Sequence, residues 1–437
     1  MKEITGKLLL IFVVSFLMLI PASASDVTYQ LRSSVYDNTD SSIKSGDFYW
    51  DANSFSGFWY QIKPGLSSEV LYFHNSANSS STFQLGDKVV EDDLYYVSKP
   101  QLKTRKIGGS DDAATYIVDD VDLEKYYLMG FFGSMYLAMP ENPSVLSDGC
   151  KPDKIAKILM EQKSEDKKQM FTGEEWKLAG GWSLVAQQID VEGNKVWVEL
   201  KKNGETIDSD VISAEVNLTR PQRTYLYKDS DDYPVFYCYV DSIFMGQTDE
   251  FVVFKYAFLR GDITCIESGG TYGAFDVTGF EVPAVMNGTN YAGSGSGTVL
   301  NTGDAALVMS SNNDITLDPD KIIDLYGNMY LKTENTKGSC LKMTLWKTCT
   351  ITVADSVASE KDTEEDTIED EAEDVAVIDM AAKESETSSF TSKENIDSAT
   401  SEKESTSDVE SSMKLPRFGL LVGALGIIAV LVFRKRI

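Results

Sequence analysis

The stretch that decides the fold is residues 173–213, GEEWKLAGGWSLVAQQIDVEGNKVWVELKKNGETIDSDVIS. Apolar and polar residues alternate along it, the pattern of strands with two unlike faces. The apolar face holds Trp182, Leu184, Ala186, Val196, Val198 and Leu200. Turn residues at 192–194 and the dipeptide Asn203–Gly204 separate the strands, and Asn-Gly favours a type I′ hairpin. Since a sheet with one apolar face needs a second layer to cover it, this stretch predicts a β-sandwich.

The flanking segments extend this prediction to residues 25–354. The runs VFYCYVDSIF (235–244) and EFVVFKYAFL (250–259) are long and apolar, as central strands are, and residues 126–139 are expected to form buried strand with glycines at bends. Only KIAKILMEQK (154–163) has apolar residues at helical spacing, so we expect one short helix there. The predicted fold class is all-β, an antiparallel β-sandwich ectodomain with two sandwich subdomains.

Seven aromatic residues crowd the segment GDFYWDANSFSGFWYQI, around Gly57. They are Phe48, Tyr49, Trp50, Phe55, Phe58, Trp59 and Tyr60. Aromatic residues are enriched in strands and bury large areas, so a sandwich core is the favoured interpretation. The alternative is an exposed platform on which sugars stack.

Both ends of the chain differ in composition from the middle. Residues 1–24 combine Lys7, the 13-residue apolar run Leu8–Ile20 and the small residues Ala22-Ser23-Ala24, a pattern that predicts a secretory signal peptide. Residues 355–413 hold 20 Asp and Glu against 4 Lys, a net charge of −16 out of −28. With one aromatic residue in 59, this segment is predicted to be a disordered acidic stalk.

Residues 414–437 predict a C-terminal transmembrane anchor. Phe418–Phe433 gives 16 uninterrupted apolar residues, about 24 Å as a helix. Arg417 and the cluster Arg434-Lys435-Arg436 flank this run, and the terminal cluster is expected to stay cytoplasmic. A basic end after a short apolar span also resembles an archaeosortase sorting signal, in which case the helix is removed and a lipid replaces it.

Candidate ligand and modification sites are few. The acidic loop with Asp111, Asp112, Asp119, Asp120 and Asp122 could hold a divalent cation such as calcium, although it lacks EF-hand spacing, and a solvated loop is the alternative. Three sequons predict glycosylation, at Asn78, Asn217 and Asn287. The five cysteines, Cys150, Cys238, Cys265, Cys340 and Cys349, are odd in number and predict buried free thiols rather than a disulfide framework.

The sequence lacks the residues that several classes of function require. His74 is the single histidine, and no nucleophile elbow surrounds it, so a catalytic triad is not expected. Neither a zinc ligand cluster nor a phosphate-binding loop occurs, and GSGSG at 293–297 lacks the Lys-Ser/Thr of such a loop. The acidic composition without basic clusters argues against nucleic-acid binding. We therefore expect no enzyme and no cofactor.

Two long segments resemble the S-layer duplication domain of Methanosarcina-type surface-layer proteins. They are DANSFSGFWYQIKPGLSSEVLYF at 51–73 and KIAKILMEQKSEDKKQMFTGEEWKLAGGWSLVAQQIDVEGNKVWVELKKNGE at 154–205, followed by YPVFYCYVDSIF and YGAFDVTGFEV. The resemblance covers residues 26–350 and implies a similar layout of signal peptide, surface domain, acidic stalk and membrane segment. The best-known members carry two tandem copies of the domain, whereas this chain has room for one.

The resemblance implies a structural cell-envelope protein of the archaeal cell surface. Its expected role is an S-layer tile or S-layer-associated protein that assembles with itself, or with a two-copy relative, into a porous protective sheath. The C-terminus would anchor it in the cytoplasmic membrane. The alternatives are a surface adhesin or polysaccharide-binding module that uses the aromatics at 48–60, and a surface hydrolase.

Overall fold

The computed structural model describes residues 24–354 except 44–45, 64, 109–115, 247–248 and 293–298. These residues all fall within one compact unit of the chain. Apart from Ala24, the predicted signal peptide, acidic stalk and membrane segment lie outside the described residues. Within the described residues, no helix is long and apolar enough to cross a membrane.

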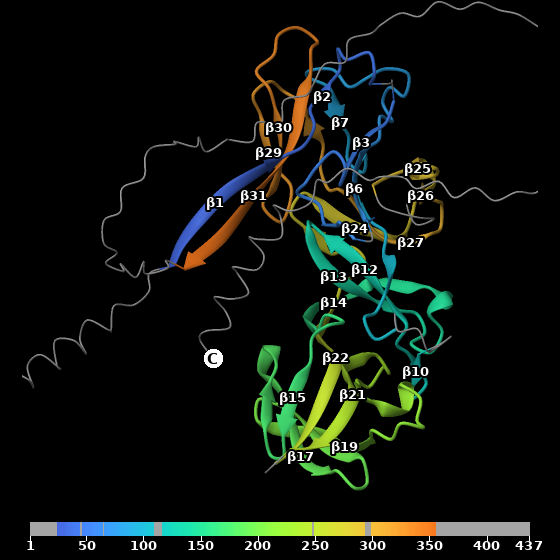
Figure 1. Cartoon of the computed structure of the whole chain (residues 1–437). Coiled ribbons are helices and arrows are strands. Elements are labelled where there is room, and N and C mark those ends of the chain that lie inside the picture. Colours follow the sequence, from blue (N-terminus) through green and yellow to red (C-terminus); the bar gives the residue numbers. More distant parts are fainter. Residues whose placement is uncertain are drawn as a thin grey trace, which may run out of the picture. The chain divides into compact units, whose positions relative to one another are not determined.

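The described residues confirm the all-β prediction, since every pair of neighbouring strands is antiparallel (Figure 1). The largest sheet has eight strands, seven of them in the order β20-β21-β22-β14-β13-β12-β9, while β15 also pairs with β22. Their bounds are β9 (Gln101–Thr104), β12 (Lys125–Phe131), β13 (Ser134–Pro140), β14 (Cys150–Glu161), β15 (Lys168–Phe171), β20 (Thr224–Lys228), β21 (Pro234–Met245) and β22 (Glu250–Cys265).

A four-stranded sheet packs against one end of this large sheet and forms a first sandwich. Its strands are β16 (Glu175–Lys177), β17 (Trp182–Asp190), β18 (Lys195–Lys202) and β19 (Glu205–Ser213), in that order. Leu184 and Val198 from this sheet share a core with Phe254 of β22, and all three side chains are fully buried. The predicted meander is therefore confirmed, with its apolar face turned to the second layer.

A second pair of sheets shares another core. The six-stranded sheet consists of β3 (Phe48–Asp51), β6 (Glu69–Phe73), β8 (Leu94–Ser98), β23 (Thr271–Tyr272), β24 (Phe275–Glu281) and β27 (Ala305–Ser311). The five-stranded sheet consists of β1 (Ala24–Arg32), β2 (Tyr36–Asp37), β29 (Ile322–Asp324), β30 (Met329–Thr333) and β31 (Lys342–Ala354). Phe73 and Met309 of the first meet Leu331 and Leu345 of the second in a single core cluster.

The eight-stranded sheet belongs to both sandwiches. On one face, Met129 of β12 and Ile155 of β14 join the core between the six- and five-stranded sheets, while Phe236 of β21 joins the core under β16–β19. The opposite face carries a third core cluster, which includes Tyr126 and Phe258. Because one sheet runs through both cores, a single cut in the sequence does not separate two subdomains.

Short elements complete the fold. Four two-stranded pairs are β4 (Tyr60–Gln61) with β5 (Leu66–Ser67), β7 (Lys88–Val89) with β28 (Ile315–Thr316), β10 (Ile117–Val118) with β11 (Val121–Asp122), and β25 (Thr289–Asn290) with β26 (Val299–Leu300). The helical turns among the described residues are of the 3-10 type and three residues long: η1 (Leu146–Asp148), η2 (Ala179–Gly181), η3 (Pro221–Arg223) and η4 (Ala284–Met286).

The helix predicted at 154–163 is wrong, because these residues lie mostly in β14. The register of β14 against β22 shifts twice, between Ala156 and Ile158 and between Ile158 and Met160. Each such bulge moves the following side chains to the other face of the strand. The apolar residues therefore lose their period-two spacing and imitate a helix.

Residues 126–139 form buried strand as predicted, but the bend at Gly133 is a full hairpin turn that divides it into two strands. β12 and β13 are joined by a turn at Phe132 and Gly133, whose φ angles of 47° and 77° are both positive. β12 is buried on both faces, and so is the second half of β13 at residues 137–139, so no apolar–polar alternation marks where one strand ends. Phenylalanine at positive φ is not a usual turn signal, which is why the sequence hides this turn.

The fully buried carboxylate of Glu69 connects the β12–β13 hairpin to the six-stranded sheet through hydrogen bonds. Glu69 Oε1 accepts hydrogen bonds from the Gly133 backbone N–H at 2.7 Å and the Tyr96 hydroxyl at 2.8 Å. Glu69 Oε2 accepts one from the Trp59 backbone N–H at 2.6 Å. One carboxylate thus holds β6, β8, the loop before β4 and the β12–β13 turn together.

The charge of Glu69 faces Lys347 of β31. The Lys347 ammonium donates to the backbone carbonyls of Phe132, at 2.9 Å, and Gly57, at 3.3 Å. Burial raises the pKa of Glu69, while the three donors and the Lys347 charge act in the opposite direction. The space is closely filled, because a Cβ atom on Gly130 would lie 2.1 Å from Glu69 Oε2.

The substitution Glu69→Ala tests this junction. It leaves two backbone N–H groups and the Tyr96 hydroxyl without an acceptor and removes the charge that faces Lys347. We expect the free energy of unfolding to fall by about 3–5 kcal/mol, measured by chemical denaturation. Glu205→Ala on the exposed edge of β19 is the control and should change it by less than about 0.5 kcal/mol. Equal effects of the two substitutions would contradict the role given to Glu69.

The turn between β18 and β19 gives a second prediction. Asn203 and Gly204 have φ angles of 52° and 85°, which confirms the type I′ turn. Gly204→Val should lower the free energy of unfolding by about 1–3 kcal/mol, because a β-branched residue is strained at positive φ. Gly279→Val in β24 is the matched control, since a Cβ at either glycine meets open space and only Gly204 has positive φ. An unchanged melting temperature for Gly204→Val would be inconsistent with this account.

Candidate functional site: exposed apolar surfaces

The aromatic segment 48–60 forms core rather than a binding platform. Trp50 is fully buried, and its indole N–H donates to the Ser34 carbonyl at 3.1 Å. Phe55 and Phe58 pack edge to face with centroids 5.0 Å apart. Of the seven aromatics only Tyr60 is largely exposed, at 48%. One exposed ring does not make the row of stacking surfaces that a polysaccharide platform needs.

Exposed aromatic side chains instead form a row at the end of the β21–β22 hairpin. Phe251 of β22 lies between its register partners Phe171 of β15 and Phe244 of β21, with ring centroids 5.9 and 5.3 Å away. Phe171 is 43% exposed and Phe244 48%. Their strand neighbours Met170, Ile243 and Val252 pack into the core, so alternation turns the three rings outward.

Two further apolar surfaces are exposed. On the outer face of the four-stranded sheet, Trp197 of β18 lies opposite Val211 of β19, and both side chains are largely exposed. On the ribbon formed by β1 and β31, Val27 lies opposite Ile351, and again both are exposed. Exposed apolar residues gathered across neighbouring strands are typical of protein interaction sites.

The candidate metal residues are only partly brought together. Asp111 and Asp112 lie outside the described residues. Asp119 and Asp120 form the turn between β10 and β11, with φ angles of 46° and 64°, and Asp122 Oδ1 caps the backbone N–H of Glu124 at 2.7 Å. Among the residues that the structure describes, no group of three or more His, Cys, Asp or Glu side chains has metal-binding geometry.

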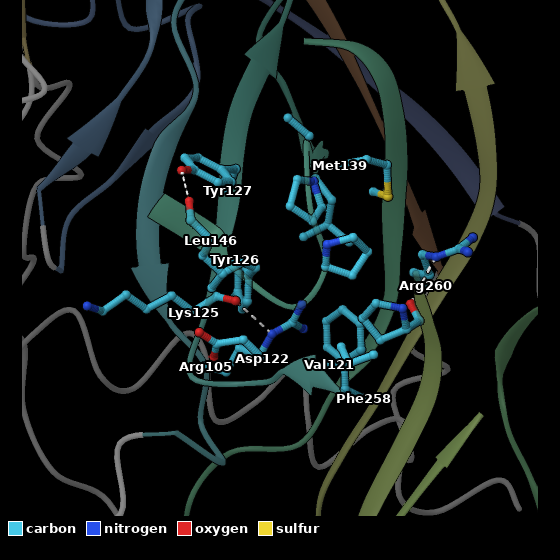
Figure 2. A pocket seen from close by; sticks show the side chains of 15 residues that line it. Arg105, Val121, Asp122, Lys125, Tyr126, Tyr127, Met139, Leu146, Phe258 and Arg260 are labelled. Atoms are coloured by element: carbon cyan, nitrogen blue, oxygen red, sulfur yellow. Dashed lines mark hydrogen bonds between the residues drawn. The ribbon is translucent and has the colours of Figure 1, made fainter. Parts of the chain in front are cut away.

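Asp122 lines a small cavity beside Arg105 (Figure 2). The cavity has room for about 20 Å³, enough for roughly one water molecule. The buried Arg105 guanidinium lies over the rings of Tyr126, at 4.8 Å, and Phe258, at 5.0 Å, and its Nε–H donates to the Lys125 carbonyl. Sequence reasoning missed this arginine, because it directly follows an ordinary strand, β9, and no motif marks it.

The sequons and cysteines are placed as follows. Asn78, Asn217 and Asn287 are all exposed, so each is accessible to a glycosylating enzyme. All five cysteines are free, as predicted, but only Cys150 and Cys238 are buried, which corrects the expectation of buried thiols for the other three. Burial raises the pKa of the Cys150 thiol to about 12, so this thiol stays protonated and inert.

The single histidine is in hydrogen-bond contact with a carboxylate. His74 Nδ1 lies 2.9 Å from Asp47 Oδ1, and Asp47 also accepts from the Tyr72 hydroxyl. In the described part of the chain, no serine, threonine or cysteine side chain is hydrogen-bonded to the His74 ring. The arrangement ties β6 to the loop before β3.

Comparison with known proteins identifies a family and several relatives. The model of the family described as S-layer protein matches residues 38–335. The Major S-layer proteins of Methanosarcina mazei and Methanosarcina barkeri are 27% identical over 319 residues and 28% over 320, in each case 72% of this chain and 39% of the relative. That of Methanosarcina acetivorans is 32% identical over 256 residues, 57% of this chain and 33% of the relative. The chain thus spans about two fifths of the length of these relatives.

The family match covers most of both sandwiches, from β3 to β30, and includes the meander 173–213 from which the fold was predicted. This chain therefore belongs to the S-layer protein family.

Proposed function

We propose that this protein is a structural component of the cell envelope, an S-layer tile or S-layer-associated protein of an archaeal cell surface. The observation that carries the proposal is the family match over residues 38–335, together with relatives named Major S-layer protein. In this role copies assemble into a two-dimensional lattice that acts as a porous protective sheath. The work of the protein is adhesion between copies rather than catalysis.

The surface chemistry supports assembly through apolar contacts. Residues 25–354 hold 47 Asp and Glu against 29 Lys and Arg, a net charge of −18, so copies of the domain repel one another at close range. Attraction must then come from apolar surface, with salt or divalent cations to screen the remaining charge. The Phe171–Phe251–Phe244 row and the Trp197–Val211 pair supply such surface on different sheets. Contacts on more than one face are what an extended array requires.

The two ends of the described region support attachment by a single tether. Ala24 pairs with Ala354 at the end of the β1–β31 ribbon, so the chain enters and leaves the fold side by side. In our proposal the signal peptide 1–24 directs export, the acidic segment 355–413 acts as a stalk, and residues 414–437 anchor the protein in the cytoplasmic membrane. Removal of that helix and replacement by a lipid is the alternative form of anchoring.

The closed fold also suits co-assembly with longer relatives. One copy of the domain is complete when its first and last strands pair, and an alignment over 39% of a relative leaves room there for a second copy. We propose that this single-copy chain either forms its own lattice or occupies positions in a lattice of two-copy relatives. Glycans at Asn78, Asn217 and Asn287, and a divalent cation at the 111–122 loop, belong to the same proposal.

The rival function, polysaccharide binding through the 48–60 aromatics, is less well supported. Trp50 and Trp59, the two tryptophans it would need, are 0% and 8% exposed. A glycan cannot stack on rings that are enclosed in the core.

Assembly of residues 25–354 tests the proposed function directly. The purified domain, concentrated with added salt or divalent cation, should form sheets or crystals built of layers, visible by electron microscopy. Very low ionic strength should oppose assembly, because the net negative charge is then unscreened. A domain that stays monomeric in every ionic condition, alone and mixed with a two-copy relative, would refute the S-layer role.

Deletion of residues 360–410 tests the stalk. A 59-residue coil has a root-mean-square span of about 40–46 Å, so the deletion should bring the domain closer to the membrane. The melting temperature of the domain should not change, since a segment with one aromatic residue in 59 has little apolar surface to add to a core. A lower melting temperature would mean that the segment is part of the fold.

A further inference from the structure

The first strand of the fold has an edge without a partner in the described part of the chain. β1 is nine residues long and pairs with β31 along its whole length, from Ala24 to Arg32, with no shift of register (Figure 1, blue and orange). It lies at the end of its sheet, so its other side presents backbone N–H and C=O groups to solvent. Such an edge is a template for pairing with another strand.

Most other strand edges in the described residues are short or protected, and the exception is the far edge of β31 at residues 349–354, which belongs to the same ribbon as β1. Proteins usually protect edges with short strands, bulges, proline, or charges such as lysine. β19 is also nine residues long, but its register breaks near Leu200 and it carries Glu205, Asp208 and Asp210. The end strands β3, β9, β16, β20, β23 and β29 have two to five residues. The sequence of β1, ASDVTYQLR, contains no lysine, proline or glycine, and no bulge interrupts it.

The two faces of β1 are unlike. Val27, Tyr29 and Leu31 lie on one face by alternation; Val27 is 50% exposed and Tyr29 41%. The other face carries Asp26, Thr28, Gln30 and Arg32. Any strand that pairs with this edge must match apolar to apolar and polar to polar.

A second copy of β1 meets this requirement. When two such strands run antiparallel about a two-fold axis through Tyr29, residues whose numbers sum to 58 lie opposite one another. Val27 then faces Leu31 of the second copy, and both lie on the apolar face. Asp26 faces Arg32 of the second copy on the polar face, and the symmetry repeats this pair of opposite charges. The strand is therefore complementary to itself in shape, polarity and charge.

We propose that β1 is a homotypic docking edge, through which two copies of this chain join antiparallel, strand to strand, into one continuous sheet. The inference deepens the proposed S-layer function and rests on it, because it names one contact by which copies meet. Main-chain hydrogen bonds would supply affinity, and the Asp26–Arg32 pairs would set the register.

Charge favours a second copy over an unrelated partner at this edge. The domain is acidic, so a contact between copies needs a place where opposite charges meet. Arg32 lies over the ring of Trp346, its register partner on β31, which keeps the guanidinium on the polar face. Both strands of the ribbon lie outside the matched residues 38–335, so the family match itself does not assign this contact.

Charge reversal tests the proposal on the full chain in detergent. Sedimentation equilibrium should show a dimer for the unmodified chain. Asp26→Lys and Arg32→Asp, each alone, put like charges opposite one another twice per dimer and should raise the dimer dissociation constant at least about tenfold. The double variant restores opposite charges and should bring the constant back to within about threefold. Asp210→Lys on β19, an exposed acid of the other nine-residue edge, is the matched control and should have no effect.

Each outcome decides the proposal. Thermal melting shows whether each variant is folded. A variant that is not folded is replaced by Tyr29→Lys, which puts two like charges on the two-fold axis. A chain that is monomeric without substitution, a dimer that both single variants leave intact, or a double variant that stays dissociated would overturn it. Sheets that persist in Asp26→Lys would overturn the β1 contact and leave the S-layer role in place. Dimers without sheets in any ionic condition would instead refute the S-layer role and keep the contact.

Discussion

The buried carboxylate of Glu69 is the interaction on which the rest of the structure depends. Its two oxygens accept from two backbone N–H groups and one hydroxyl, and these donors come from three different segments of the chain. A carboxylate in this position is costly to desolvate unless its acceptors are used, and Lys347 supplies the opposing charge. The same ammonium donates to Phe132 and Gly57, so β31 is drawn into the network. The consequence is a fixed junction between the six-, five- and eight-stranded sheets.

That junction lies on the sheet that makes the described residues one unit although they have two sandwich cores. One face of the eight-stranded sheet packs against both cores, one at each end of the sheet. Glu69 binds the β12–β13 hairpin of this sheet. Forces on one core pass to the other through a continuous hydrogen-bonded sheet rather than through a linker. For a component of a protective sheath, a fold without an internal hinge keeps the spacing of its outer surfaces constant.

Different surface residues serve solubility and assembly in the proposed role. Acidic side chains keep the domain soluble before assembly, since a net charge far from zero opposes association. In the proposed assembly, apolar rows on separate sheets provide the attraction, and the proposed tether at the cell surface raises the effective concentration of copies. The open edge of β1 adds direction, because main-chain pairing and a charge-matched register admit few geometries.

The sequence by itself determined the strand class and the local turns. Period-two alternation marked β17, β18 and β19, and the positive φ needed by Asn203–Gly204 marked their hairpin, because both features depend only on residues close in the chain. The core role of the 48–60 aromatics followed from their size and apolarity, and the family resemblance from two continuous segments. Only the tertiary structure decided the rest. Bulges in β14 gave a strand the spacing of a helix, and the positive φ of Phe132, which no usual turn residue marks, concealed the first position of the β12–β13 turn. The roles of Glu69 and Arg105 depend on partners that lie far away in the sequence. The role of the β1 edge depends on the absence of a neighbouring strand in the described residues. Such long-range relations leave no local pattern in the sequence.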